Sequence, residues 1–392
     1  MELKAFEKNL FSQLEKYDEI CFGLNCGEFG WEIIIIAPLI RLFKKIYPKK
    51  KVYVATREDR KELYLDSGLD DIIVFNIDGD YKTVTPRTNT LKGTPKNTAG
   101  RPIDLDIQAI FSSIKESITQ KYPNVTFFSF DNLPFTSSPQ YDFENYDFDF
   151  KSDPINKSII DNIVKKNKDK KVITIFPRHR IDLAHRNWTE KNWKDLYKKL
   201  NDDDDYLIFV SGKSPSYIKP PKRLKNIYNL EDLTEKYNSS SILGLSIEAI
   251  KKSRFTFGPQ TAGILLSNIF KVPTVYFGKE ENLVSDKYNP FKTKHFFINV
   301  QYSSDYEYII DIDTVYKSIR FFDENMHVAN LSDIKIDKYE VEHICKFPSF
   351  NPDLAGLEGE ALQEKIREIN ANPNYKIPMV ETTIRRKRLQ IE

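Results

Sequence analysis

The sequence predicts an α/β fold of two doubly wound parallel sheets that face a cleft, followed by a C-terminal appendage. The chain has 392 residues, which is long for a single hydrophobic core. Short apolar segments alternate with longer amphipathic ones, an order typical of parallel strands joined by crossover helices. The alternation fades after residue 128 and restarts at residue 171. We therefore predict domains at 1–150 and 151–326, and an extension at 327–392.

The first domain has the pattern of a Rossmann-like unit. Its expected strands are residues 20–24, 51–55, 71–75 and 125–128, and its expected helices are 31–46, 57–65 and 107–121. Residues 81–101 are rich in Thr, Asn, Pro and Gly, which predicts a long loop of the kind that is often functional. The stretch 131–154 shows no periodicity, so we place the interdomain linker there.

The second domain repeats the pattern, so a second Rossmann-like unit is predicted. Its expected strands are residues 171–176, 206–210, 255–257 and 274–277, and its expected helices are 190–200, 242–252, 261–270 and 313–322. From residue 327 the sequence turns irregular and Pro-containing, with one amphipathic helix expected at 356–370. The basic run 385–388 fits either a solvated tail or a contact with a phosphate backbone.

Composition and charge narrow the class of protein. The sequence is 40% hydrophobic and 30% charged, as in folded globular proteins, and its net charge of +2 gives no overall attraction to nucleic acid or membrane. Cys21, Cys26 and Cys345 lack C-x-x-C spacing, so we expect neither a zinc knuckle nor disulfides. The longest apolar stretch, residues 33–40, is far shorter than the roughly 20 residues of a membrane span. No signal-peptide pattern opens the chain, and we expect a cytoplasmic protein with no transmembrane segment.

Ligands of doubly wound sheets bind beyond the carboxyl ends of the strands, where this chain has the loops that open at Asn25, Pro177, Ser211 and Gly258. The first of these loops carries two carboxylates, Glu28 and Glu32. Either one is a candidate for the base that takes a proton from an acceptor hydroxyl, and either one also suits the first turn of a helix through the helix dipole. The residues assigned to the acceptor side of this loop are Gly27, Phe29 and Gly30.

The loop that follows the strand at 171–176 is strongly basic. Three arginines and two histidines lie within nine residues, and arginine pairs with phosphate in a planar bidentate geometry. We interpret the loop as a site for the diphosphate of a leaving group; the alternative is a solvated basic loop. The predicted donor-binding residues here are Arg178, His179, Arg180, Arg186 and Asn187.

A third loop, residues 257–263, opens a helix with small residues and a hydroxyl. Its backbone N–H groups can hold phosphate or ribose oxygens, although the same residues also serve as ordinary turn and cap residues. The predicted ligands are Gly258, Gln260, Thr261, Ala262 and Gly263. Lys213 lies in a segment that resembles the end of a phosphate loop, but Leu207 stands where such a loop requires glycine. Lys213 is therefore kept only as a candidate contact to a donor phosphate.

Together these segments resemble the heptosyltransferase-like glycosyltransferases. Residues 173–200, the Asn229-Leu230 element and residues 258–278 follow in that family's order and spacing, and Glu32 lies six residues before Pro38. The resemblance implies a GT-B fold, an inverting transfer from a nucleotide-sugar donor, and neither a catalytic metal nor another cofactor. The resemblance assigns the role of catalytic base to Glu32, with Glu28 as the alternative. It assigns the contact with the donor phosphates to Arg186.

The chain also departs from that family. Gln260 stands where the family usually has an acid, Ala262 replaces a glycine and Leu265 replaces a histidine. The resemblance implies a glycan or glycolipid acceptor. Two alternatives stay open. The first is a modified base of DNA as acceptor, suggested by the basic run 385–388 and by a composition typical of an AT-rich, bacterial or viral genome. The second is a non-catalytic module that binds nucleotide sugars or glycans.

Overall fold

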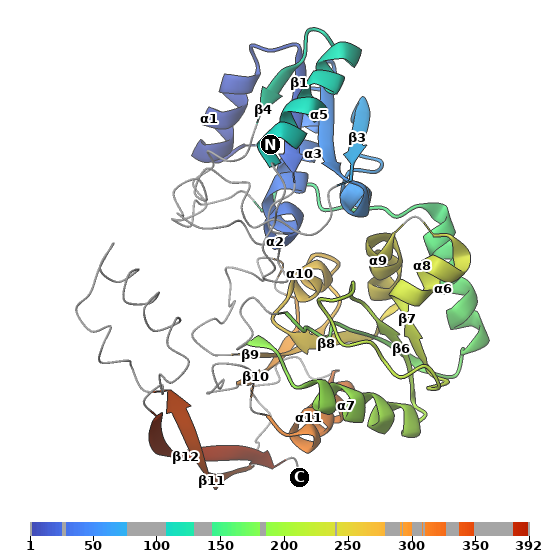
Figure 1. Ribbon diagram of the computed structural model, residues 1–392, viewed down its shortest axis with the longest axis vertical. Helices are drawn as coiled ribbons and strands as arrows, with labels where there is room; N and C mark the ends of the chain where they lie inside the picture. Colours follow the sequence, from blue (N-terminus) through green and yellow to red (C-terminus); the bar gives the residue numbers. More distant parts are fainter. Residues whose placement is uncertain are drawn as a thin grey trace.

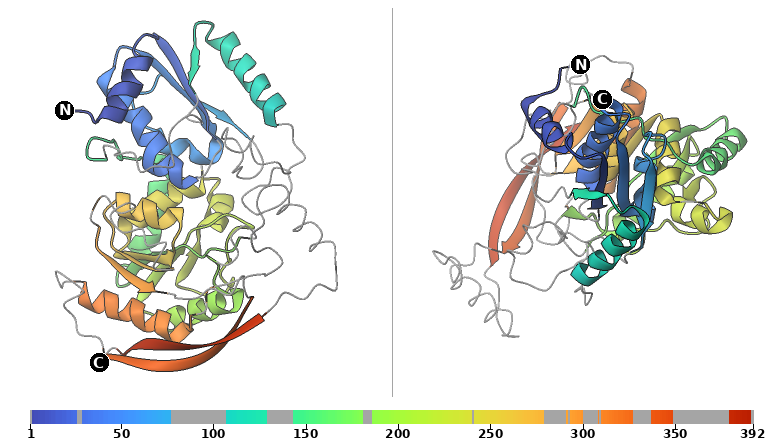
Figure 2. Two further views of the ribbon diagram at one scale, coloured as in Figure 1. Left: turned by 90° about the vertical axis from the view of Figure 1, so that its left-hand side faces the viewer. Right: turned by 90° about the horizontal axis from the view of Figure 1, so that it is seen from above.

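The predicted α/β fold with two parallel sheets is confirmed by the computed structural model (Figure 1). The structure describes residues 2–25, 29–76, 107–128, 143–180, 186–239, 241–278, 291, 293–299, 308, 310–326, 337–348 and 379–390. The two sheet-containing units are stacked along the long axis of the molecule, and a two-stranded ribbon lies beyond the second unit (Figure 2).

The first unit contains a four-stranded sheet in the order β3-β2-β1-β4, with every neighbouring pair parallel. Its strands are β1 (Glu19–Asn25), β2 (Lys51–Arg57), β3 (Asp71–Phe75) and β4 (Thr126–Phe128). Its helices are α1 (Ala5–Leu14), α2 (Phe29–Trp31), the π-helical turn η1 (Glu32–Ile36), α3 (Ala37–Ile46), the 3-10 helix η2 (Glu58–Leu63) and α5 (Ile107–Lys121). The wide turn η1 ends two residues before Pro38, whose missing N–H and bulky ring disturb a regular α-helix.

The second unit contains a six-stranded parallel sheet in the order β10-β9-β8-β5-β6-β7. Its strands are β5 (Lys171–Ile175), β6 (Tyr206–Val210), β7 (Ile227–Asn229), β8 (Phe255–Pro259), β9 (Thr274–Gly278) and β10 (His295–Asn299). Its helices are α6 (Pro154–Lys166), α7 (Glu190–Asp202), α8 (Leu230–Tyr237), α9 (Ile242–Lys252), α10 (Ala262–Ile269) and α11 (Ile312–Asn325). The chain passes from β5 outward to β7 and then returns to β8 on the other side of β5, which is the strand order of a dinucleotide-binding Rossmann sheet.

The two units share one hydrophobic cluster. Ile33 and Ile34 of η1 belong to the same buried cluster as Leu243 of α9 and Ile264 and Leu266 of α10. Fully burying an Ile or Leu side chain is worth about 1.5–3 kcal/mol, so the apolar contact between η1 and α10 holds the units together.

The C-terminal extension differs from the irregular structure expected from its sequence. β11 (Asp337–Pro348) and β12 (Met379–Gln390) form an antiparallel ribbon, and the basic run 385–388 lies within β12 and not in a free tail. Arg385 occupies the register position opposite Glu342, and Lys387 the one opposite Glu340. The loop predicted at 81–101 and the helix predicted at 356–370 lie outside the described residues.

Candidate functional site

The loops after β5 and β8 meet at the point where the second sheet reverses its strand order. Ligands of open α/β sheets bind beyond the carboxyl ends of the strands at such a point. The two loops lie very close together at Phe176, which follows β5. A Cβ added to Gly258 would lie 2.8 Å from the Phe176 oxygen, and one added to Gly263 would lie 2.3 Å from a carbon of the Phe176 ring. Glycine at both positions therefore allows the two loops to touch.

Asn187 fixes the conformation of the loop that follows β5. Its side chain is buried, with 3% exposure, and its Oδ1 accepts hydrogen bonds from the Arg178 guanidinium and from the Arg180 backbone N–H, the latter at 3.0 Å. Its Nδ2 donates to the Arg180 backbone oxygen at 2.8 Å. Arg178 is itself only 5% exposed. In the described part of this loop, residues 176–180 and 186–189, Arg178 and Asn187 are therefore buried and hydrogen-bonded to each other.

Arg186 connects the two loops. Its Nη2 donates a hydrogen bond of 2.7 Å to the backbone oxygen of Gln260. Burial raises the pKa of Tyr308, and the charges of Arg186 and Arg178 partly offset this rise. No carboxylate of the described part of the chain lies within ion-pair distance of Arg186, so its positive charge is left for an anionic ligand.

Tyr308 is a site residue that the sequence analysis missed. It is 2% exposed, its ring packs edge-on against Phe277 at 5.6 Å, and its backbone N–H donates to the backbone oxygen of Asn187. It lies more than a hundred residues after Arg186 in a segment without a recognisable motif, so no signal in the sequence pointed to it.

The N-terminus of α10 lies beside this cluster. Thr261 is the N-cap residue, but its hydroxyl makes no capping hydrogen bond, and its Oγ1 is buried with no partner among the described residues. The first-turn N–H groups of Ala262 and Gly263 have no acceptor within the helix, as at every helix start. Free N–H groups, the positive end of the helix dipole and an unused hydroxyl are together suited to oxygens of a phosphate.

His179 extends the cluster toward the loop after β6. Its backbone N–H donates to the Ser216 oxygen at 2.9 Å, and its Nδ1 is buried without a hydrogen-bond partner among the described residues. The loops after β5, β6 and β8 therefore form one continuous edge, and this edge presents Arg178, His179, Arg180, Arg186 and Thr261.

No protein-family model matches the sequence, and no curated protein matches it. The structure is similar to the glycosyl transferase family 9 protein of Veillonella parvula, with 12% identity over 79% of this chain and 98% of that chain and a TM-score of 0.47. It is also similar to the ADP-heptose lipopolysaccharide heptosyltransferase II of E. coli, with 10% identity over 80% of this chain and 100% of that chain and a TM-score of 0.49. A third similar structure is the wall teichoic acid polymerase TagF, with 16% identity over 81% and 84% of the two chains and a TM-score of 0.31.

Glu32 lies in a buried polar network and is only 1% exposed. Its Oε1 accepts hydrogen bonds from the Thr56 hydroxyl at 3.0 Å and the Tyr64 hydroxyl at 2.8 Å, and its Oε2 is ion-paired with Arg60. This arrangement ties η1 to β2 and η2, and it occupies both carboxylate oxygens. Glu28 and Gly27, the other candidates in this loop, lie outside the described residues.

The first loop nevertheless reaches the second unit. α2 and η1 contact α10, and a Cβ added to Gly30 would lie 3.5 Å from the Leu265 side chain. Phe29 lies under the Arg60 guanidinium, whose carbon is 5.4 Å from the ring centre. The fold thus brings the predicted acceptor side next to the helix that opens at Thr261.

Lys213 is placed differently from the other predicted donor-binding residues. Its Nζ lies 3.4 Å from Asp59 of η2, and its side chain is 63% exposed. Loop 211–217 is held by Glu231, which accepts from the Ser214 backbone N–H at 2.8 Å and from the Tyr217 hydroxyl at 2.9 Å. In this structure Lys213 bridges the two units.

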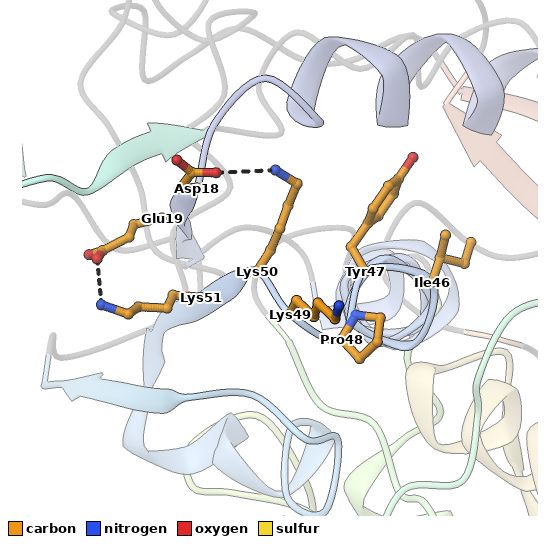
Figure 3. Close-up of a pocket in the computed structure, with 8 residues that line it drawn as sticks. All are labelled: Asp18, Glu19, Ile46, Tyr47, Pro48, Lys49, Lys50 and Lys51. Carbon is orange, nitrogen blue, oxygen red and sulfur yellow. Dashed lines mark hydrogen bonds and ion pairs between the residues drawn. The ribbon is translucent and has the colours of Figure 1, made fainter.

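A pocket of about 530 Å³ lies at the opposite end of the first sheet, where β1 and β2 begin (Figure 3). Two of its lysines pair with acids of the same pocket: Lys51 is 2.6 Å from Glu19, and Lys50 is 3.8 Å from Asp18. It is therefore separate from the loops at the carboxyl ends of the strands.

In the described portion of the chain, no three His, Cys, Asp or Glu side chains gather where they could hold a metal ion, and no helix there is long and apolar enough to cross a bilayer.

Proposed function

We propose that this protein is a glycosyltransferase that moves a sugar from a nucleotide-sugar donor to a hydroxyl acceptor. The observation that supports the proposal is the convergence of Arg178, Arg180 and Arg186 with the free N-terminus of α10 at the switch point of the second sheet. Fixed guanidinium groups and backbone N–H groups are the donors that a diphosphate leaving group requires.

In the proposed reaction, the acceptor oxygen forms a bond with the anomeric carbon while the bond from that carbon to the donor phosphate oxygen breaks. The electron pair of the broken bond stays on the diphosphate, where Arg178 and Arg186 stabilise the added negative charge. The acceptor proton passes to a base in the first loop. A single displacement of this kind inverts the anomeric centre.

The base is proposed to come from Glu28 or Glu32. Both oxygens of Glu32 already accept hydrogen bonds from Thr56, Tyr64 and Arg60, and this favours Glu28 for the proton transfer and Glu32 for holding the helix in place. A base must present a lone pair to the acceptor hydroxyl.

We further propose that the reaction needs no divalent cation, because the arginines supply the positive charge that neutralises the leaving group. The measurement is turnover in EDTA. Undiminished activity is expected, and activity that is lost in EDTA and restored by Mg²⁺ or Mn²⁺ would overturn this part of the proposal.

A glycan or glycolipid is the proposed acceptor class. The basic run 385–388, which suggested DNA, lies in β12 opposite a strand that places Glu340 and Glu342 at paired positions. Binding to duplex DNA that weakens steeply with added salt would instead favour the DNA alternative.

The decisive experiment is a panel of UDP, GDP, ADP and CMP sugars that includes ADP-heptose, the donor named for the E. coli enzyme. A donor at about 100 times its dissociation constant adds roughly 2.7 kcal/mol to the free energy of unfolding and raises the melting temperature. The donor that does so should also be hydrolysed slowly without acceptor. Stabilisation without any hydrolysis or transfer would favour a binding module, and a panel with no effect would contradict the proposal.

A further inference from the structure

We propose that Glu62 is a positioning residue that fixes the orientation of the two units, and with it the distance between the first loop and the donor site. The inference rests on the proposed function, because it assigns the acceptor to the first unit and the donor to the second. Glu62 belongs to η2 of the first unit, yet its fully buried carboxylate lies against α9 of the second unit.

The contact is a chain of two hydrogen bonds at the N-terminus of α9. Ser241 is the N-cap residue of this helix, and its hydroxyl oxygen accepts the backbone N–H of Gly244 at 2.9 Å. The same hydroxyl donates its proton to Oε1 of Glu62. The negative charge of Glu62 therefore lies at the positive end of the α9 dipole, and a side chain of the first unit completes the cap of a helix of the second unit.

Gly244 leaves the space for this contact. A Cβ added to Gly244 would lie 3.0 Å from Oε1 of Glu62 and would overlap the side-chain amide of Asn156, which belongs to α6. Asn156 is fully buried, and Ser241 is 7% exposed. Side chains from η2 and α6 therefore converge on the first turn of α9, where a residue larger than glycine would force them apart.

The apolar contact between the units supplies attraction, and the Glu62 hydrogen bond supplies direction. The cluster that η1 shares with α9 and α10 is hydrophobic, and burial of apolar surface favours contact without fixing one geometry. A buried carboxylate has lost its hydration, so separating it from a hydrogen-bond donor while it stays buried is costly. Any rotation of the units that kept Glu62 buried but moved it away from Ser241 would therefore be disfavoured.

The same short helix also contacts the helical segment behind the first loop. Arg60, two residues before Glu62, is ion-paired with Glu32 of η1, and η1 follows directly after α2. The bridge between Asp59 and Lys213 also joins η2 to the second unit, but Lys213 is 63% exposed, and exposed pairs of this kind contribute little. The acceptor side is therefore placed relative to the donor site mainly through Glu62.

The test compares Glu62→Ala, which removes the contact, with Glu62→Gln, whose side-chain oxygen can still accept the Ser241 hydroxyl. The proposed donor residues belong to the second unit, so Glu62→Ala should bind nucleoside diphosphates in calorimetry as the wild-type chain does. Its sugar transfer should fall about tenfold or more relative to hydrolysis of the donor without acceptor, because a displacement of about 1 Å between reacting groups suffices for such a loss. Glu62→Gln should recover most of the transfer. Small-angle X-ray scattering should give a larger radius of gyration for Glu62→Ala.

Glu58→Gln is the matched control, since Glu58 lies on the same helix and pairs with Lys61 of that helix at 2.6 Å. It removes the same charge from η2 and leaves the Ser241 contact intact. Thermal unfolding of each variant reports whether it folds.

A folded Glu62→Ala variant with the transfer-to-hydrolysis ratio and the scattering of Glu58→Gln overturns the inference and leaves the proposed function standing. If Glu62→Ala does not fold, the same result in Ser241→Ala, which removes the hydrogen bond from the other unit, overturns it. A wild-type chain that binds no nucleoside diphosphate contradicts the proposed function, and the scattering of Glu62→Ala against Glu58→Gln then decides the inference by itself.

Discussion

Arg186 donates a hydrogen bond to the backbone oxygen of Gln260, and this contact joins the loop after β5 to the loop after β8. Both partners lie beside the N-terminus of α10, the helix that also meets α2 and η1 of the first unit. A ligand held by Arg186 would therefore lie next to the place where helix α10 of the second unit meets α2 and η1 of the first. This relationship gives the site its most direct test.

Arg186→Ala should lower turnover by on the order of a hundredfold, because one well-placed charged donor to the leaving group is worth about 3–4 kcal/mol in the transition state. Arg186→Lys keeps the charge but lacks the planar guanidinium that can bond to the Gln260 oxygen and pair with a phosphate at once, so it should recover only part of the activity. The measurement is kcat/KM with the donor found by the panel. The exposed Arg223→Ala is the control. A folded Arg186→Ala variant with near-normal kcat/KM would refute the donor assignment.

Two threonines at helix starts make a matched pair. Thr189 caps α7, since its hydroxyl accepts the Asn192 N–H at 3.0 Å, whereas the Thr261 hydroxyl caps nothing in α10. Thr189→Val should therefore cost about 1 kcal/mol of unfolding free energy and leave donor binding unchanged. Thr261→Val should have little effect on stability and should weaken donor binding about fivefold. Urea unfolding and calorimetry separate the two effects. Equal loss of stability in both variants would show that Thr261 is an ordinary cap.

Much of the fold could be predicted because buried parallel strands appear in a sequence as continuous runs of apolar residues. Residues 206–210, Tyr-Leu-Ile-Phe-Val, are all buried in β6 and were placed correctly, and helix α5 has the predicted bounds. The edge strands β7 and β10 were missed, since a strand at the edge of a sheet is defined mainly by its pairing with the one neighbouring strand. Helix α6 was missed although Asp153 caps it and Pro154 occupies its first turn, a signature that the sequence does contain.

The proximity of the arginines to one another could be predicted, because Arg178, Arg180 and Arg186 follow one buried strand within nine residues. Their binding of a donor stays a prediction. Glu32 could not be assigned in the same way, because a carboxylate serves equally as a base and as one half of a buried ion pair. Its partner Arg60 lies 28 residues away in the chain, and only the folded structure brings the two together.

The two glutamates of the first loop should respond differently to amide substitution. Glu32→Gln removes the charge that Arg60 pairs with while both are buried, and breaking such a pair from one side typically costs about 3–5 kcal/mol. We expect a large fall in melting temperature. Glu28→Gln should leave the melting temperature unchanged and lower kcat by about a hundredfold or more if it is the base. Melting curves and kcat for both variants decide the matter, and two fully active variants would reject both candidates.

Asp323 of α11 should make the second unit sensitive to acid. Its side chain is fully buried, and burial alone would raise its pKa. The carboxylate accepts hydrogen bonds from Lys171 at 2.7 Å, from Arg254, and from Tyr206 at 2.9 Å. These bonds hold the pKa of Asp323 below the usual value. A carboxyl group whose pKa is lowered by folding contributes stability that is complete above its unfolded pKa of about 3.9 and is lost as the pH falls through the folded value.

The free energy of unfolding should therefore fall as the pH drops below about 4, and the loss attributable to this group should be absent in Asp323→Asn. At neutral pH the variant should already be less stable, because Lys171 and Arg254 lose their counter-charge. Urea unfolding of both proteins between neutral and acidic pH gives the two curves. They should converge in acid, where the wild-type carboxyl group is protonated. Curves that stay parallel over the whole range would mean that Asp323 does not link the fold to pH.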